Sequence, residues 1–147
     1  MNNIKVNVKK LTDDAILPSY GTPFAAGADL YSASETFSIE PGKTVLVHTG
    51  IAVEIPVGYV GLIYARSGLA TKKGLAPANK VGVIDSDYRG EIMVALYNHS
   101  DQTREVEKGE RVAQLVITPY LTAELCEVET LSDTARGEGG FGSTGTK

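Results

Sequence analysis

Short segments in which hydrophobic and polar residues alternate follow one another along most of the chain, and Gly, Pro, Asn or Asp residues separate them at close intervals. A period of two is typical of strands that bury one face, and frequent turn residues are typical of sheets with short connections. We therefore predict an all-β single domain, a jelly roll or β-barrel-like fold. The expected strands are Ile4–Lys9, Thr44–His48, Ile51–Ile55, Tyr59–Ala65, Glu91–Tyr97 and Val112–Ile117.

One segment departs from this pattern. Arg66–Gly74 contains helix-tolerant residues, a serine at a possible N-cap position (Ser67), two lysines in its last turn and a glycine that can end a helix. We predict one short helix of one or two turns. The segment can be an anion site formed by Arg66, Ser67 and free backbone amides, or simply a capped surface turn.

The bulk composition excludes several classes of protein. The chain has 147 residues, 42% apolar and 22% charged, which suits one domain with a real core. A net charge of -4 argues against a general nucleic-acid binder. No apolar run approaches the roughly 20 residues of a membrane span, and no signal peptide is visible, so we expect a soluble, intracellular (cytoplasmic) protein. The single cysteine, Cys126, excludes an internal disulfide and is expected to be an apolar residue, buried or half-buried, in a strand-like stretch, Ala123–Val128.

The last residues have a different composition. We divide the chain into a β domain, 1–135, and a C-terminal arm, 136–147, whose many glycines make ordering costly and mobility the expected state. A plain flexible terminus explains the glycines but not an arginine, an aromatic ring and two hydroxyls, namely Arg136, Phe141, Ser143 and Thr144.

A second informative segment is Gly82–Ile92, which places carboxylates and a tyrosine on a turn between two apolar stretches. Asp85 can act as a general base that activates water, or it can be a turn residue that bonds its own backbone. Asp87 suits the second of these roles. The two histidines, His48 and His99, are expected to be structural or solvated, and the run Arg104–Arg111 to be a solvated hairpin.

Five segments, taken in order, resemble the five motifs of the trimeric dUTP diphosphatases (dUTPases). Because the match spans nearly the whole chain, it is far more specific than any single glycine-rich motif. It implies a jelly roll that hydrolyses dUTP to dUMP and pyrophosphate, which keeps uracil out of DNA and supplies dUMP for dTMP synthesis. The segments are Ala26–Ser32, Ala65–Ala70, Gly82–Ile92, Gly109–Val116 and Arg136–Gly145.

The resemblance also implies roles for individual residues. Asp85 would hold the water that attacks the α-phosphorus, and the ring of Tyr88 would leave no room for a ribose 2′-hydroxyl. An opened hairpin around Asn79 to Tyr88 would read uracil, Arg66 and Gln114 would hold phosphates, and Phe141 would cover the base. The expected substrate-binding residues are Arg66, Ser67, Gly68, Asn79, Gly82, Val83, Ile84, Tyr88, Met93, Gln114, Arg136, Phe141, Gly142, Ser143 and Thr144.

Cofactor and partners follow from the same resemblance. Asp29 would hold the hydration shell of a Mg²⁺ ion bound to the triphosphate, and each site would be shared by the chains of a homotrimer, with no nucleic-acid or membrane partner. Two other functions remain to be separated from this one. A dCTP deaminase can use the same fold, and a regulatory protein can bind dUTP without turning it over.

Overall fold

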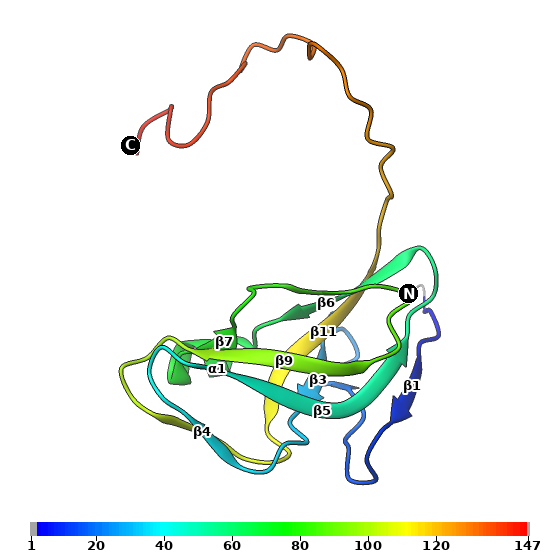
Figure 1. Cartoon of the computed structure of the whole chain (residues 1–147), viewed down its shortest axis with the longest axis vertical. Coiled ribbons are helices and arrows are strands. Elements are labelled where there is room, and N and C mark those ends of the chain that lie inside the picture. Colours follow the sequence, from blue (N-terminus) through cyan, green and yellow to red (C-terminus); the bar gives the residue numbers. More distant parts are fainter. Residues whose placement is uncertain (1–2, 147) are drawn as a thin grey trace.

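Strands make up most of the regular structure in residues 3–146, the part of the chain that the computed structural model describes. They surround one core, and a long C-terminal extension leaves the domain at the end of the last strand (Figure 1). The elements are β1 (Asn7–Lys10), β2 (Ser19–Tyr20), β3 (Ala28–Tyr31), β4 (Phe37–Ile39), β5 (Thr44–Glu54), β6 (Tyr59–Tyr64), α1 (Ser67–Lys73), β7 (Leu75–Pro77), β8 (Gly82–Ile84), β9 (Glu91–Asn98), β10 (Arg104–Val106) and β11 (Arg111–Pro119).

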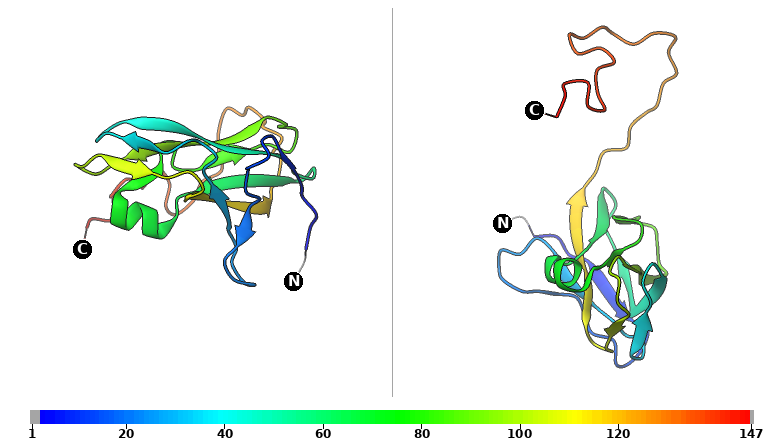
Figure 2. Two further views of the ribbon diagram at one scale, coloured as in Figure 1. Left: turned by 90° about the horizontal axis from the view of Figure 1, so that it is seen from below. Right: turned by 90° about the vertical axis from the view of Figure 1, so that its left-hand side faces the viewer.

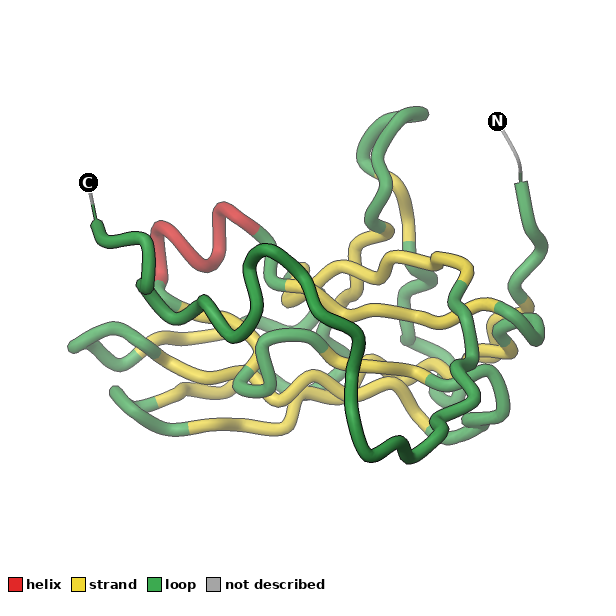
Figure 3. Tube along the Cα trace, turned by 90° about the horizontal axis from the view of Figure 1, so that it is seen from above, coloured by secondary structure: helices red, strands yellow, loops and turns green. Residues whose placement is uncertain are grey.

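The strands form two larger sheets and one small one. The first has the order β1-β5-β9-β7, the second β2-β3-β11-β6-β8, and β10 pairs with β4 in the third. All of these pairs are antiparallel. Figure 3 shows the strands in layers with the single helix at one side. This arrangement confirms the predicted all-β jelly-roll class with one short helix.

The alternation of β9 explains how the sequence builds the core. Its inward positions Ile92, Val94, Leu96 and Asn98 are buried, and the residues between them are only partly covered. The apolar members of this face meet side chains from both sheets in one cluster. Burial of one face of each strand supplies the main stabilising free energy.

The two strands predicted on either side of Thr49–Gly50 are one continuous strand, β5, so that prediction is wrong in its count. The pairing of β5 with β9 shifts register between His48 and Ala52, which indicates a bulge. Gly50 has a φ of 68°, and an added Cβ would lie 2.8 Å from the Thr12 hydroxyl oxygen. The glycine therefore bends a strand instead of ending it.

The run Arg104–Arg111 does not form the expected hairpin. Its first strand, β10, pairs with β4, whereas β11 pairs with β3 and β6 in another sheet. Lys108 in the intervening turn places its Nζ 2.6 Å from Asp14 Oδ2 and 2.6 Å from Glu35 Oε1. The hydrogen bond from Lys108 lowers the pKa of Asp14 below its ordinary value. This turn thus ties two distant loops instead of joining paired strands.

Helix α1 is confirmed, but its cap differs from the prediction. Arg66 is the N-cap residue, with extended backbone and no side-chain cap, and Ser67 is the first helical residue. The Ser67 carbonyl accepts the Thr71 hydroxyl at 2.8 Å. Gly74 ends the helix in the left-handed conformation, as its position in the sequence predicts.

After Pro119 the described chain has no further strand, and it extends away from the domain (Figures 1 and 2). The strand-like stretch expected around Cys126 is therefore wrong for the single chain, and the cysteine is exposed. A strand needs a neighbouring edge for its backbone hydrogen bonds, and no strand of the described residues lies beside this segment. Residues 136–146 of the expected arm form the end of this longer extension.

In residues 3–146, no helix combines the length and the apolar composition that crossing a membrane requires.

Asn98 holds three chain segments together inside the domain. Its amide nitrogen donates to Ile39 O at 2.8 Å and to Gln102 O at 2.7 Å, and its Oδ1 accepts from the Ser100 amide at 2.9 Å. The side chain is fully buried. Because each bond satisfies a polar group away from water, the amide cannot be removed without leaving partners unpaired.

We expect Asn98→Ala to lower the free energy of unfolding by about 3 kcal/mol, because it leaves buried carbonyls without donors and opens a small cavity. Urea unfolding at a fixed protein concentration measures the change. The matched control is Asn7→Ala, which removes only an exposed bond to Glu54 of 2.7 Å and should cost less than about 1 kcal/mol. Equal losses in the two variants would contradict the role of Asn98.

Candidate active site

The segment from β7 to β9 opens a cavity between the two larger sheets. β7 pairs with β9 only as far as Pro77↔Leu96, and one further bond joins the Ala78 amide to Ala95 O. The chain then turns through Lys80, whose φ is 67°, and β8 joins β6 instead. The predicted hairpin is therefore open: the free edge of β8 faces part of β9 across a cavity of about 300 Å³.

Seven of the expected site residues line this cavity, and all of them lie in the segment that runs from the end of β7 into β9. They are Asn79, Gly82, Val83, Ile84, Asp85, Tyr88 and Met93.

The wall at Gly82 leaves no space for a side chain. A Cβ there would lie 3.2 Å from Ile63 Cβ and 3.5 Å from the amide nitrogen of Asn79. Because β8 is the last strand of its sheet, the backbone groups on its outer edge have no ladder partner. The cavity thus offers bare backbone donors and acceptors beside one amide side chain, which suits a planar polar ligand.

Asp85 follows β8 directly and is exposed at the cavity. The turn after it is closed by the Tyr88 amide, which donates to Asp85 O at 3.1 Å. Arg89 adds a second bond, from its Nη1 to Ser86 O at 2.6 Å. The turn is therefore fixed through main-chain groups and Arg89, and the Asp85 carboxylate stays accessible to a ligand or water.

Tyr88 lies on the same turn. Its hydroxyl donates to Glu91 O at 2.8 Å, and its ring passes over Gly90. The residue is 39% exposed and lines the cavity, so its hydroxyl is fixed while part of the ring stays accessible there.

A second group of expected residues lies on β3, at the start of α1 and on β11. Arg66 Nε donates to Asp29 Oδ1 at 2.8 Å, and Arg111 Nη1 lies 3.4 Å from Asp29 Oδ2. The Asp29 side chain is only 15% exposed, so this pairing is partly shielded from water. The guanidinium of Arg66 keeps further donors for an anion, because only its Nε is used by the aspartate.

Gln114 connects three of these segments. Its Nε2 donates to Ala65 O at 2.9 Å, and its register partners are Asp29 on β3 and Tyr64 on β6. A Cβ on Gly27 would collide with the Gln114 amide oxygen. The amide is therefore held directly beside the start of the Arg66–Ser67 segment, where Ser67 and Gly68 are exposed.

The donor set suits a metal that is held mainly by other ligands. The described residues contain no group of three or more His, Cys, Asp or Glu side chains able to hold a metal ion. Magnesium keeps most of its waters and often uses one or two carboxylates together with substrate phosphates. The Asp29 carboxylate, set among the phosphate candidates, fits this indirect mode.

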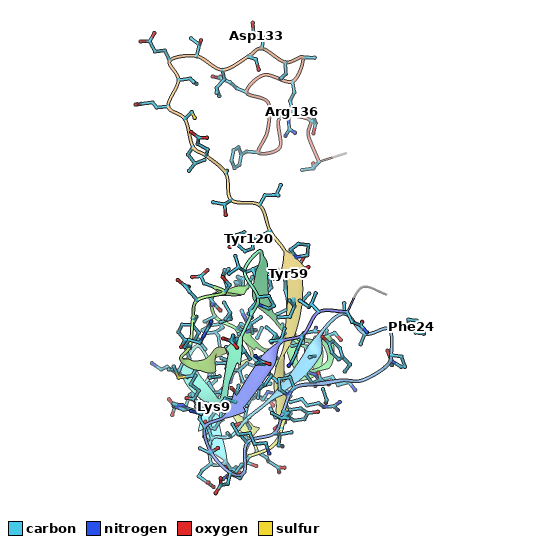
Figure 4. The ribbon with its side chains drawn as sticks, turned by 90° about the vertical axis from the view of Figure 1, so that its right-hand side faces the viewer. Lys9, Phe24, Tyr59, Tyr120, Asp133 and Arg136 are labelled. Atoms are coloured by element: carbon cyan, nitrogen blue, oxygen red, sulfur yellow. The ribbon has the colours of Figure 1, made fainter. Side chains whose placement is uncertain are left out.

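The third group lies on the extension. Arg136 Nε donates to Gly139 O at 2.7 Å, and Phe141 is fully exposed with a φ of 51°. Figure 4 shows Arg136 and Asp133 well away from Tyr59 and Tyr120, which lie where the extension leaves the domain. Within one chain, the structure therefore does not bring Arg136, Phe141, Gly142, Ser143 and Thr144 to the cavity.

The sequence analysis missed several residues of the cavity. Leu46, Ile63, Pro77, Val94 and Ala95 line it from four strands, and their apolar character gives no signal beyond core burial. Glu91 is different, because a carboxylate at the start of an apolar strand could have been noticed. It lines the cavity, and its Oε2 lies 2.6 Å from Nδ1 of His48, which was expected to be structural or solvated.

Comparison with known proteins gives one consistent result. The family model described as dUTPase matches residues 13–145. The chain is 54% identical to a deoxyuridine 5′-triphosphate nucleotidohydrolase of Hydrogenobaculum sp. over 144 residues, which cover 98% of this chain and 100% of the relative. It is also 54% identical to the protein of that name from Nautilia profundicola, over 97% of this chain and 99% of the relative.

Solved structures agree with these relatives. The dUTPase of Staphylococcus bacteriophage 80alpha with dUPNHPP superposes with a TM-score of 0.89 and 35% identity, over 98% of this chain and all of that chain. A mutant dUTPase of phage phi11 of S. aureus, which coordinates a structural Mg(II) ion, gives a TM-score of 0.78 and 32% identity, over 86% of this chain and 98% of that chain. The chain therefore belongs to the dUTPase family.

Proposed function

We propose that this chain hydrolyses dUTP to dUMP and pyrophosphate, with Asp85 as the general base that activates the attacking water. Its family supports the overall reaction and argues against deamination of dCTP. The observation that carries the residue assignment is the open hairpin, which sets an accessible carboxylate at the rim of a cavity with bare backbone walls.

The chemistry follows from these positions. A water molecule held by Asp85 loses a proton to the carboxylate as its oxygen bonds to the α-phosphorus. The bond between the α-phosphorus and the bridging oxygen breaks, and pyrophosphate leaves with that oxygen. The proton passes from Asp85 to solvent before the next turnover.

Uracil would lie in the cavity between β8 and β9. Free backbone groups of β8 and the Asn79 amide can match its two carbonyls and its ring N–H, whereas cytosine presents the wrong pattern. The bare wall at Gly82 fits closely against the base edge. Val83, Ile84 and Met93 complete the cavity around it.

The triphosphate would be held by the second and third groups of residues. Arg66, Ser67, Gly68 and Gln114 present a guanidinium, a hydroxyl and amides, and the arm adds Arg136, Gly142, Ser143 and Thr144. A divalent ion is part of this scheme, and we assign it as Mg²⁺, held through water by Asp29. When bound, the ion would neutralise charge on the triphosphate. Phe141 would cover the base and exclude water.

We further propose a homotrimer whose sites are shared. Three sets of residues have to contact a single substrate: those of the cavity, those proposed to bind phosphate, and those of the arm. Within one described chain these three sets lie in separate places. The extension also exposes apolar side chains, with Leu121 97% and Leu125 91% exposed. Such residues need cover, which a neighbouring protomer can supply.

Asp85→Asn removes the proton acceptor and keeps the shape of the side chain. We expect kcat for dUTP to fall by about 10³-fold, while the binding of a non-hydrolysable dUTP analogue stays within about threefold. Pyrophosphate release and calorimetric titration measure the two quantities. A near-normal kcat would remove Asp85 from this role.

An assay of the unmodified chain distinguishes the three candidate functions. With dUTP, dCTP, dTTP and UTP as substrates, a dUTP hydrolase releases pyrophosphate from dUTP, a deaminase releases ammonia from dCTP, and a regulatory protein that only binds dUTP releases neither.

Mixing two inactive chains tests the shared site. Asp85→Asn chains and chains that end before Arg136 should each be inactive, and subunit exchange between them should restore part of the activity, because some sites then combine an intact Asp85 with an intact arm. The control mixes the truncated chain with one that carries both defects. Absence of recovery, with exchange shown by mass spectrometry, argues against sharing.

Phe141→Ala tests the covering role of the arm. We expect kcat/KM for dUTP to fall by about tenfold, because water is excluded less well and a stacking contact is lost. The control is Phe24→Ala, which removes a phenylalanine that is 85% exposed outside the arm and should leave activity unchanged. If a bound dUTP analogue leaves the NMR mobility of the arm unaltered, the covering role fails.

A further inference from the structure

The ring of Tyr88 is held by two residues to which the motif pattern gives no role. Its hydroxyl donates to Glu91 O at 2.8 Å. Below the ring lies Gly90, where a Cβ would come within 2.5 Å of the Tyr88 hydroxyl oxygen and 2.6 Å of Cζ. The backbone of Gly90 is not in the left-handed region, so the space for the ring, not backbone conformation, requires glycine here.

Glu91 is itself fixed to the interior of the domain. Its Oε1 accepts the Gly50 amide at 3.1 Å, and its Oε2 lies 2.6 Å from His48 Nδ1. The side chain is only 22% exposed, and Gly50 is buried in the bulge of β5. Both carboxylate oxygens are therefore engaged, although Glu91 lines the cavity. This pattern suits a structural anchor better than a substrate ligand.

We infer that Gly90 and Glu91 are positioning residues that fix the ring of Tyr88 and thereby set the selection of dUTP over UTP. The inference rests on the proposed function, in which this ring lies against the deoxyribose. The Tyr88 ring can exclude the 2′-hydroxyl of a ribose only if the ring is unable to move away from it. The bulge of β5 supplies that rigidity through the Glu91 carboxylate, and Gly90 leaves the space that the ring occupies beside the turn.

The decisive measurement is the ratio of kcat/KM for dUTP to kcat/KM for UTP. Gly90→Ala pushes the ring out of place, and Glu91→Ala frees the carbonyl that holds the hydroxyl, so we expect each to lower this ratio by about tenfold or more. Glu91→Gln should stay within about threefold of the unmodified protein, because its amide oxygen can still accept from Gly50 and its nitrogen can bond His48.

A matched surface carboxylate serves as control. Glu40→Ala removes an exposed carboxylate from the loop that bonds Asn98, at the other end of β9 from Glu91, so its ratio should not change. If Gly90→Ala or Glu91→Ala fails to fold, Tyr88→Phe removes only the hydroxyl that donates to Glu91. We expect a smaller fall in the same direction from this variant.

The outcomes separate the inference from the function on which it rests. Equal losses for dUTP and UTP, with the ratio unchanged in Gly90→Ala and Glu91→Ala, would show a merely structural role and overturn the inference. A ratio as low in Glu91→Gln as in Glu91→Ala would also overturn it, because the negative charge of Glu91, and not its hydrogen bonds, would then determine the selection. Failure of the unmodified chain to release pyrophosphate from dUTP would instead overturn the proposed function.

Discussion

The pairing of β9 is the constraint on which the rest of this structure depends. β5 pairs with β9 on one side, whereas on the other side β7 covers only the Leu96–Asn98 part, so β8 lies opposite the start of β9, which is unpaired on that side, without joining it. Backbone groups that leave one sheet have to find partners elsewhere, and β8 finds them on β6. The chain between β8 and β9 therefore crosses from sheet to sheet, and the cavity opens beneath it.

The positions of Asp85 and Tyr88, the two candidate site residues on the turn, follow from this crossing between sheets. Asp85 lies at the point where β8 ends, so its carboxylate reaches the cavity rim. Tyr88 lies halfway across, where its hydroxyl is anchored to the start of β9 through Glu91 O. A paired hairpin would have used the same backbone groups in its own ladder and left nothing for a ligand.

The phosphate candidates depend on a different set of pairings. β11 lies between β3 and β6, which places Gln114 opposite Asp29 and Tyr64 and so gathers three distant segments. The Asp29 carboxylate orders Arg66, and the Gln114 amide holds the carbonyl just before it. Partly buried charge-assisted bonds of this kind orient a guanidinium more firmly than exposed pairs do. The exposed extension carries Arg136 and the aromatic ring of Phe141, and its uncovered leucines indicate a contact beyond the single chain.

The sequence by itself determined the fold class and the short helix with its terminal glycine, and it proposed the residues of the candidate site, because alternation, turn residues and the five motifs are local patterns. It also indicated an opened hairpin through the motif resemblance. Only the tertiary structure decided that Gly50 bends one strand instead of separating two, and that Arg104–Arg111 joins different sheets. It also decided that the Tyr88 hydroxyl bonds the Glu91 carbonyl and that the stretch around Cys126 finds no sheet edge within the described residues of its own chain. These outcomes depend on which backbone groups, far apart in the sequence, hydrogen-bond to one another. A local sequence pattern does not specify that pairing.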